Sequence, residues 1–507
     1  MKKNAFTLVE LLAIITVLAV ILVIAVPKII NTIKDAKMGS LKSSVILLAK
    51  DAEEEYGIRD AKGTLDQVKN PIKCEDVANI DDTYDKCQIK FDKEGNATVL
   101  LNANEKSKFG KIGCVGTKSK VECDNGEMTL SKRCTTPDKL EYNLKFVDGQ
   151  YTYTYNGSTG WSVVLTDKTS TDPVITELCG TINDKPIVSM YQMFYQSKAE
   201  SIDTSSFDTS SVTSMNSMFS DSAATEIKGL ENFDTSNVAN MNEMFRGSAA
   251  AALDLSGFDT SNVTTMHMML TSSSATEING LENFDTSKVT NMSSMFSRTK
   301  VTMLDLSNFD TSKVTDTSYM FNESAATEIK GLEKFNTSNV TSMSGMFLSS
   351  TATSLDLSSF DTSKVTTMYR MFLNSAVVSL NLSSFDTSNV TDMSNMFFQS
   401  AATTLDLSSF DTSNVTNMSS MFYKSATTTL DLSSFDTSKV TDMGWMFWGS
   451  AAASLDLSSF DTSNVTDMNW MFYLSKATTG YARTQEDADR LNASSGKPSA
   501  LSFVVKS

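Results

Sequence analysis

The sequence predicts an α/β repeat fold, a leucine-rich-repeat-like solenoid with short parallel strands on one wall and short helices on the other. A long N-terminal helix and a small β-rich domain precede it. Three observations lead to this prediction. A core of F-D-T-S or F-N-T-S recurs eleven times between residues 207 and 460, at spacings of 25 or 26 residues. An apolar segment fills residues 6–26. All six cysteines precede residue 180, whereas 25 of the 28 methionines lie between 190 and 471.

The charge of the chain narrows the classes of function. The 507 residues carry a net charge of −17, and residues 187–507 account for −16 of it, with 18 basic and 34 acidic side chains. Because affinity for phosphate comes from clustered Lys and Arg, no nucleic-acid partner is expected. The single histidine, His267, excludes most general-base and zinc chemistry, and no cofactor is expected.

The N-terminal segment has the length of a membrane span. Two lysines precede residues 6–26, and about 20 apolar residues cross a bilayer core as a helix. Glu10 lies inside the run, where an ionisable group is costly and normally has a partner. Beyond Pro27, apolar residues recur at spacings of three and four, which predicts an amphipathic helix to about Tyr56. An ordinary signal peptide and a plain membrane anchor are the alternatives.

The residues F-T-L-V-E-L at 6–11 resemble the type IV prepilin signal. The resemblance implies that a prepilin peptidase cleaves between Ala5 and Phe6 and that Phe6 is N-methylated. It implies that Glu10 pairs with the amine of a neighbouring pilin-like subunit and that Pro27 kinks the helix. Ala5 departs from the glycine that is usual before the cut. The expected divisions are a leader (1–5), a pilin-like helix (6–56, with 6–26 in the membrane) and a small β domain (57–134).

The cysteines are even in number and lie outside the expected membrane helix, which favours disulfides in an extracytoplasmic protein. Sequence neighbours suggest three pairs, the last of which would tie the pilin-like part to the rest of the chain. The rival interpretation is a zinc site, but no C-x-x-C motif or nearby histidine supports it. The candidate pairs are Cys74–Cys87, Cys114–Cys123 and Cys134–Cys179.

Each repeat can be divided into a strand, a turn and a helix. In the unit at 405–429, L-D-L-S alternates apolar and polar residues and predicts a short strand. D-T-S-N predicts a turn, because Asp, Ser and Asn side chains bond nearby backbone amides. Thr416 is expected to cap a two-turn helix. The inward face of that helix would consist of Val415, Met418, Met421 and Phe422.

Two further features of the repeats can be interpreted. Stacked copies would bury the apolar sides that a single unit leaves open, so the methionines are expected to fill the core. A methionine metal site is the rival interpretation, and no metal is expected. The 26-residue units place an extra residue beside a glycine, which predicts a β-bulge at Gly229, Gly280 and Gly331.

The pattern L-x-L-S-x-F-D-T-S-x-V-T-x-M-x-x-M-F over 187–476 resembles the BspA-type leucine-rich repeat family of bacterial surface proteins. The family's Cys after M-F is absent here. The resemblance implies a solenoid displayed on the cell surface that binds host proteins or other bacteria. Residues 135–186 and 477–507 are expected to cap its two ends, with a helix at 484–492 and a strand at 501–505 in the second cap.

The leading functional hypothesis is a surface adhesion protein on a pilin-like anchor, in the cytoplasmic membrane or in a pilus-like fibre. A candidate acidic binding strip for a cationic partner or divalent ions consists of Asp356, Asp406, Asp431 and Asp456. The alternative for these residues is a solvated face that keeps the solenoid soluble. The D-T-S aspartates are expected to be structural turn residues.

The second hypothesis is a minor pilin or pseudopilin whose repeats form a bulky head. An enzyme is not expected, because a catalytic carboxylate pair should stand out from the repeat, and none does.

Overall fold

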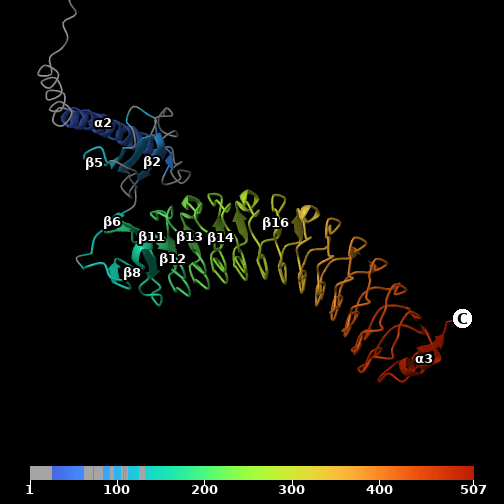
Figure 1. Cartoon of the computed structure of the whole chain (residues 1–507). Coiled ribbons are helices and arrows are strands. Elements are labelled where there is room, and N and C mark those ends of the chain that lie inside the picture. The colour runs from blue at the N-terminus through green and yellow to red at the C-terminus, as the bar shows by residue number, and fades with distance from the viewer. Residues whose placement is uncertain are drawn as a thin grey trace, which may run out of the picture. The chain divides into compact units, whose positions relative to one another are not determined.

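The chain divides into two compact units, Met1–Ser131 and Lys132–Ser507, in a computed structural model (Figure 1). The structure describes residues 26–61, 72–73, 84–91, 96–103, 107, 109, 112–124, 132–136 and 138–506. Ala5, Phe6, Glu10 and Cys74 lie outside the described residues, and so do the expected cleavage site and all but the last residue of the expected membrane span.

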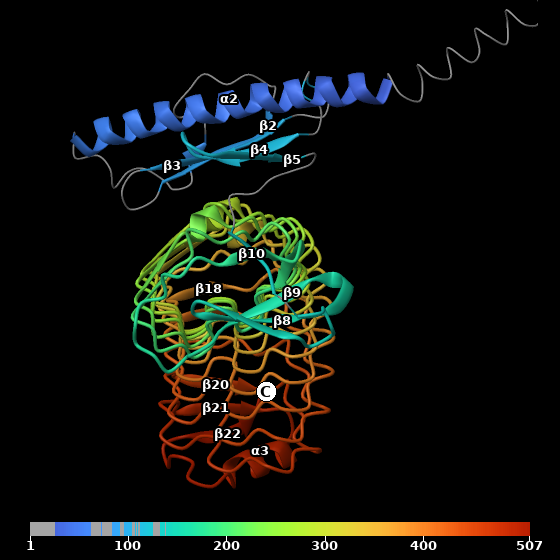
Figure 2. The ribbon, with the colours of Figure 1, turned by 90° about the vertical axis from the view of Figure 1, so that its left-hand side faces the viewer.

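The first unit is a helix on a sheet. Helix α2 (Val26–Ala61) lies across five antiparallel strands in the order β1-β2-β3-β4-β5 (Figure 2). The strands are β1 (Ile72–Lys73), β2 (Tyr84–Phe91), β3 (Ala97–Ala103), β4 (Gly113–Gly116) and β5 (Val121–Asp124). Pro27 is the second residue of α2 as described, so the expected kink involves residues outside the described part. Among the described residues, no helix combines the length and apolar content that a membrane crossing needs.

The core of the first unit forms where α2 meets the sheet. Leu41, Val45 and Ala52 of α2 are fully buried at spacings of four and seven, the period of one helix face. They pack in one cluster with Val99 and Leu101 of β3. The amphipathic pattern after Pro27 therefore gives the packing face that it predicts.

The disulfides follow the predicted pairs where the structure describes them. Cys114 and Cys123 face each other across β4 and β5 and are bonded. Cys87 is also disulfide-bonded, but its expected partner lies outside the described residues. Cys134 and Cys179 are bonded, yet both belong to the second unit. The expectation that this pair ties the two units together is wrong, because residues 132–134 pair as a strand beside residue 179.

A six-stranded mixed sheet opens the second unit, in the order β6-β10-β11-β9-β8-β7. Alternate residues of Y-T-Y-T-Y and W-S-V-V-L are buried, and the ring nitrogen of Trp161 donates to the Ile182 carbonyl (3.1 Å). The elements are β6 (Lys132–Cys134), β7 (Lys145–Asp148), β8 (Tyr151–Tyr155), η4 (Gly157–Thr159), β9 (Trp161–Leu165), β10 (Cys179–Ile182) and β11 (Lys185–Ser189).

The repeats form a β-solenoid of about 14 turns, hereafter coils. The predicted parallel strands are present but short, and they pair residue for residue with the next coil, as Leu380 does with Leu405. They are β12 (Ser201–Asp203), β13 (Glu226–Lys228), β14 (Ala252–Asp254), β15 (Glu277–Asn279), β16 (Met303–Asp305), β17 (Glu328–Lys330), β18 (Ser379–Asn381), β19 (Thr404–Asp406) and β20 (Ser454–Leu457).

The expected helix in each repeat is wrong. Residues 418–425 and their equivalents form consecutive tight turns, here called the turn wall. Ser420 and Lys424 have positive φ angles (57° and 47°), which a right-handed helix excludes. Alternate amides donate to the next coil rather than within a helix, as from Met418 to the Asp442 carbonyl (3.0 Å). Thr416 caps no helix, and its hydroxyl donates to the Thr391 carbonyl of the preceding coil (3.2 Å).

The predicted β-bulges are also wrong. The extra glycine of each 26-residue unit follows the strand and begins a 3₁₀ turn: η5 (Leu230–Asn232), η6 (Leu281–Asn283) or η7 (Leu332–Lys334). Gly280 has φ of 92°, and a Cβ there would lie 2.5 Å from the Leu255 carbonyl carbon. Glycine is required because the backbone is left-handed and touches the preceding coil.

Ladders of identical side chains fill the core of the solenoid. In most coils the phenylalanine before D-T-S and the phenylalanine of M-F stack on a counterpart one coil away, and Leu270 interrupts the second ladder. Phe410 and Phe435 lie 6.4 Å apart, and Phe372 and Phe397 lie 5.8 Å apart. Met418 and Met421 are fully buried, which confirms methionine as core filling.

A small cap closes the C-terminal end. Strands β20, β21 (Thr479–Ala482) and β22 (Ser502–Val505) continue the parallel pairing, and α3 (Gln485–Asn492) occupies the place of the predicted 484–492 helix. The buried Asp487 accepts hydrogen bonds from the Thr462 amide (3.0 Å) and hydroxyl (2.8 Å). The cap thus supplies the acceptor that a further coil would have offered.

Candidate binding surface of the solenoid

The acidic strip is assembled only in part. Repulsion from Asp431 acts to raise the pKa of Asp406, and repulsion from Asp456 acts to raise the pKa of Asp431. No such interaction is resolved for Asp356, because Asn381 follows it in the next coil. Among the described residues, the strip contains no group of three ligands that converge on one point.

Each aspartate of the strip also holds its own turn. The hydroxyl and amide of the serine two residues on lower the pKa of Asp356, Asp406 and Asp431. Burial acts to raise the pKa of Asp456, but hydrogen bonds from Lys506 and Ser458 have the larger combined effect, so its pKa is below the ordinary value. These carboxylates therefore have structural partners within the chain, although they remain largely exposed to solvent.

The D-T-S aspartates behave as the sequence predicts. Asp411 accepts from the Ser413 amide (2.9 Å), and Asp436 accepts likewise from Ser438 (2.9 Å). The threonine between them in the motif is buried and joins coils, because Thr412 donates to the Asp436 carbonyl (2.8 Å). The motif is therefore part of the scaffold.

The turn wall is the place where the repeats differ most. Its segment reads M-x-A-M-F-B-C-S, where A, B and C mark three columns of residues that run from coil to coil. Columns A and C have positive φ in every coil from 192 to 474, and their side chains range from glycine to arginine and tryptophan. The amides of columns A and C donate to the next coil, as from Ser420 to the Gly444 carbonyl (2.9 Å). The backbone is thus fixed while the side chains vary.

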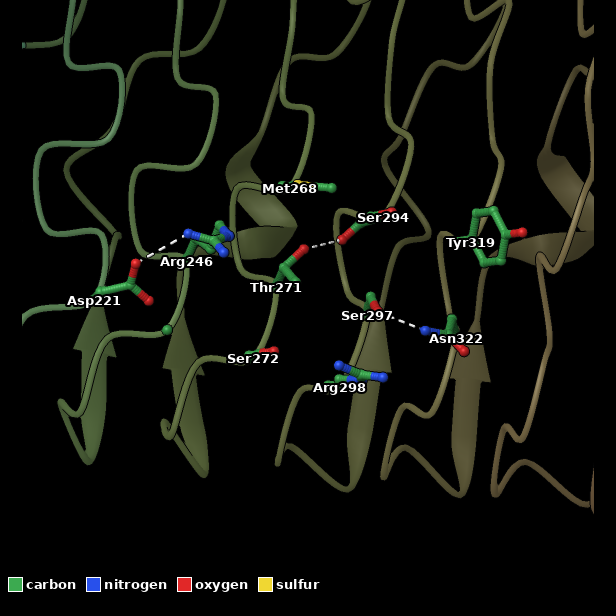
Figure 3. Close-up of a pocket in the computed structure, with 11 residues that line it drawn as sticks. Asp221, Arg246, Met268, Thr271, Ser272, Ser294, Ser297, Arg298, Tyr319 and Asn322 are labelled. Carbon is green, nitrogen blue, oxygen red and sulfur yellow. Dashed lines mark hydrogen bonds and ion pairs between the residues drawn. The ribbon is translucent and has the colours of Figure 1, made fainter.

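A hollow of about 370 Å³ lies on this wall (Figure 3). It forms because small residues of three successive coils stand between larger ones, and its size falls in the range of ligand pockets. The lining residues all belong to columns A, B and C: Asp221, Arg246, Gly247, Met268, Thr271, Ser272, Ser294, Ser297, Arg298, Tyr319 and Asn322.

Two guanidinium groups flank the hollow. Arg246 pairs with Asp221 (3.0 Å), and Arg298 makes two hydrogen bonds to Glu323 (2.9 and 3.1 Å), which raise the pKa of Arg298. Asn322 donates to Ser297 (3.0 Å), but its buried Oδ1 accepts no hydrogen bond within the described residues. Hydroxyls, amides and two ion-paired guanidinium groups therefore line the space, which suits a polar ligand.

The hollow does not include any residue of the acidic strip. It was not predicted from the sequence. Its signal is visible in the repeats: Arg246 and Arg298 interrupt columns that carry Ser297 and Ser272 in other coils. Such departures can be found only once the units are aligned column by column.

The parallel coils, with a constant core beneath columns that vary, place this protein in the class of β-solenoid repeat proteins. A family model described as "Mycoplasma protein of unknown function, DUF285" matches residues 173–278, 222–330, 269–383 and 374–484, and the chain belongs to this family. No curated protein and no solved structure matches the chain.

Proposed function

We propose that the protein is a cell-surface binding protein that presents its solenoid for adhesion. The observation that carries this proposal is the turn wall, where columns A, B and C vary in chemistry above a constant core. A surface that differs from coil to coil on a fixed backbone is suited to recognising an extended partner. The BspA-type repeat pattern over 187–476 supports the same function. The partner would be a host or bacterial molecule outside the cell.

The anchor in this proposal is the prepilin-like N-terminus. Cleavage between Ala5 and Phe6 by a prepilin peptidase would leave residues 6–26 as the membrane segment. Edman sequencing of the protein purified from cells tests this step: an N-terminal methyl-Phe6 is expected, and an intact Met1 contradicts it.

A minor pilin or pseudopilin is the second candidate, because α2 packs along an antiparallel sheet in the first unit. In that role Glu10 would pair with a neighbouring subunit. Pili purified from producing cells should then contain the protein. Its retention in the membrane fraction alone would contradict the assembly role and leave the adhesion role standing.

Adhesion is tested by measuring binding of the full chain to whole bacteria and to immobilised extracellular matrix proteins. If the hollow contributes, Arg246→Ser with Arg298→Ser should weaken binding about tenfold, as the loss of two charge-assisted contacts allows. Lys364→Ser with Lys439→Ser is the matched control, since it removes the same charge from exposed sites elsewhere in the repeats. Absence of binding to every target would contradict the proposal.

A further inference from the structure

Six aromatic side chains gather on the turn wall of the last four full coils. Four occupy column B, and two tryptophans occupy column A. Three of the four tryptophans in the chain are among them. The six residues, here called the aromatic ridge, are Phe398, Tyr423, Trp445, Trp448, Trp470 and Tyr473.

The column B rings of the ridge form a stack. Phe398 and Tyr423 lie 4.2 Å apart and Tyr423 and Trp448 lie 4.5 Å apart, nearly parallel in both cases. Tyr473 continues the line at 5.6 Å from Trp448. The ammonium of Lys424 lies 4.7 Å from the Trp448 ring centre. The stack is therefore a rigid wall beside column A.

The two column A tryptophans lie outside the buried core. Trp445 and Trp470 expose 44% and 43% of their surfaces, whereas the M-F phenylalanines beneath the wall are buried. The two preceding coils carry Asn395 and Ser420 at this place with the same left-handed backbone. Large apolar surfaces left in water where a small polar residue suffices mark an interaction site.

The backbone amides in the middle of the ridge are already hydrogen-bonded within the solenoid. The Trp445 amide donates to the Asn469 carbonyl (3.0 Å), the Lys424 amide to Trp448 (2.6 Å) and the Trp448 amide to Trp445 (3.0 Å). Strand addition requires a free edge of amides and carbonyls, which these bonded amides do not offer. Recognition must use side chains alone.

Two properties of the ridge define the partner. Its rings recur once per coil along a line, about 4.8 Å apart by strand spacing, so they fit a linear polymer lying along the solenoid axis. Apart from the ring-bound Lys424, the three columns across these four coils carry neutral groups, with hydroxyls and amides such as Ser420, Asn395 and Gln399 beside the rings. The carboxylates of the strip lie on the strand wall instead.

We infer that the aromatic ridge binds a neutral linear polysaccharide. The C–H faces of successive sugars would pack on Trp445 and Trp470, and their hydroxyls would bond to the neighbouring amides and hydroxyls. An aromatic face supplies apolar contact at little entropic cost, and the stacked column holds the site rigid. The inference rests on the proposed binding function and names a partner class for one part of the solenoid.

The test is calorimetric titration of the full chain with cellulose and chitin oligosaccharides of two, four and six sugars. The hexasaccharide of at least one series should bind, and more tightly than its disaccharide, because longer chains reach more coils. Trp445→Ser with Trp470→Ser restores residues of the repeat type. It should weaken this binding by roughly tenfold or more, the usual loss for a central aromatic contact. Tyr142→Ala is the control, an aromatic residue that is 72% exposed outside the wall.

Circular dichroism melting must show that the tryptophan variants fold, and Trp445→Ser alone is the milder variant. Unchanged affinity in a folded variant, or no binding by either series, overturns the inference. Dimerisation that the double variant abolishes also overturns it, because a second copy is then the occupant. If one of these results is found but the full chain still binds cells, the polysaccharide inference fails and the proposed adhesion function survives. If the full chain binds neither cells nor sugars, the inference and the proposed function both fail.

Discussion

Single hydroxyl groups hold successive coils together. The threonines of the D-T-S motifs are buried. From Thr209 to Thr437, each hydroxyl donates to the backbone carbonyl of the first residue (Asp or Asn) of the same motif in the next coil. A buried carbonyl without a partner costs about 1 to 3 kcal/mol. The motif is therefore repeated because every coil has the same acceptor to satisfy.

Replacing Thr412 by valine should lower the free energy of unfolding by about 1 to 3 kcal/mol, because the Asp436 carbonyl loses its donor while the side-chain shape is kept. Thr416→Val is the control. It removes a similar bond (3.2 Å) at an exposed site, where water can replace the donor. Urea unfolding compares them, and equal losses would contradict this account.

Asp487 gives the C-terminal cap a pH dependence. Burial raises its pKa, but hydrogen bonds from Thr484, Thr462 and Arg483 lower it more, to about 2 from 3.8. The stabilisation is therefore complete above about pH 4 and is lost as the pH falls toward 2. Asp487→Asn should cost about 2 kcal/mol at pH 7 and much less at pH 2. Unfolding curves at the two pH values measure this, and a cost independent of pH would refute the charged role.

At the scale of elements, the strands could be predicted and the turn wall could not. Alternation in L-D-L-S predicts a strand, and the parallel pairing follows from the repeat. The spacing of Val415, Met418, Met421 and Phe422 fits a helix face equally well as a set of turns, and all four are buried. Whether the segment forms a helix or turns depends on whether its amides bond within the segment or to a neighbouring coil. The sequence of a single unit does not contain that information.

The 3₁₀ turns of the 26-residue units depend on their glycine. Gly280→Ala should cost roughly 2 kcal/mol, from the left-handed backbone and the clash with residues 255–256. Gly444→Ala is the control, because its nearest neighbour would be the Asp442 carboxylate at 3.3 Å and its φ is not positive. Thermal melting of the two variants should differ by several degrees. An equal effect would show that the glycine is not required.

For the second unit as a whole, stability should be nearly additive in coils. Deleting residues 405–429 removes one unit and rejoins strand to strand, so the protein should fold with a slightly smaller urea m-value. Deleting 405–424 is the control, since it places turn residues against strand residues. If both deletions fold equally well, coil register does not govern the fold.

Candidate sites were harder to predict than the solenoid. The acidic strip was found because Asp recurs in register, yet recurrence is also what a scaffold produces, and Asp406 and Asp431 hold turns. The hollow beside Arg246 and the aromatic ridge depend on residues that depart from the repeat. Their proximity appears only when coils are stacked and columns A to C are seen as neighbours.

The left-handed residues of columns A and C separate what the wall displays from what keeps it folded. Across the coils, residues as different as glycine, serine, glutamate, arginine and tryptophan adopt this backbone conformation. A pair of coils could therefore exchange these residues, or be duplicated, without a new fold having to be found. Side chains on the turn wall can therefore change from coil to coil while the backbone and the core stay the same. Related chains could acquire new binding specificities by such substitutions.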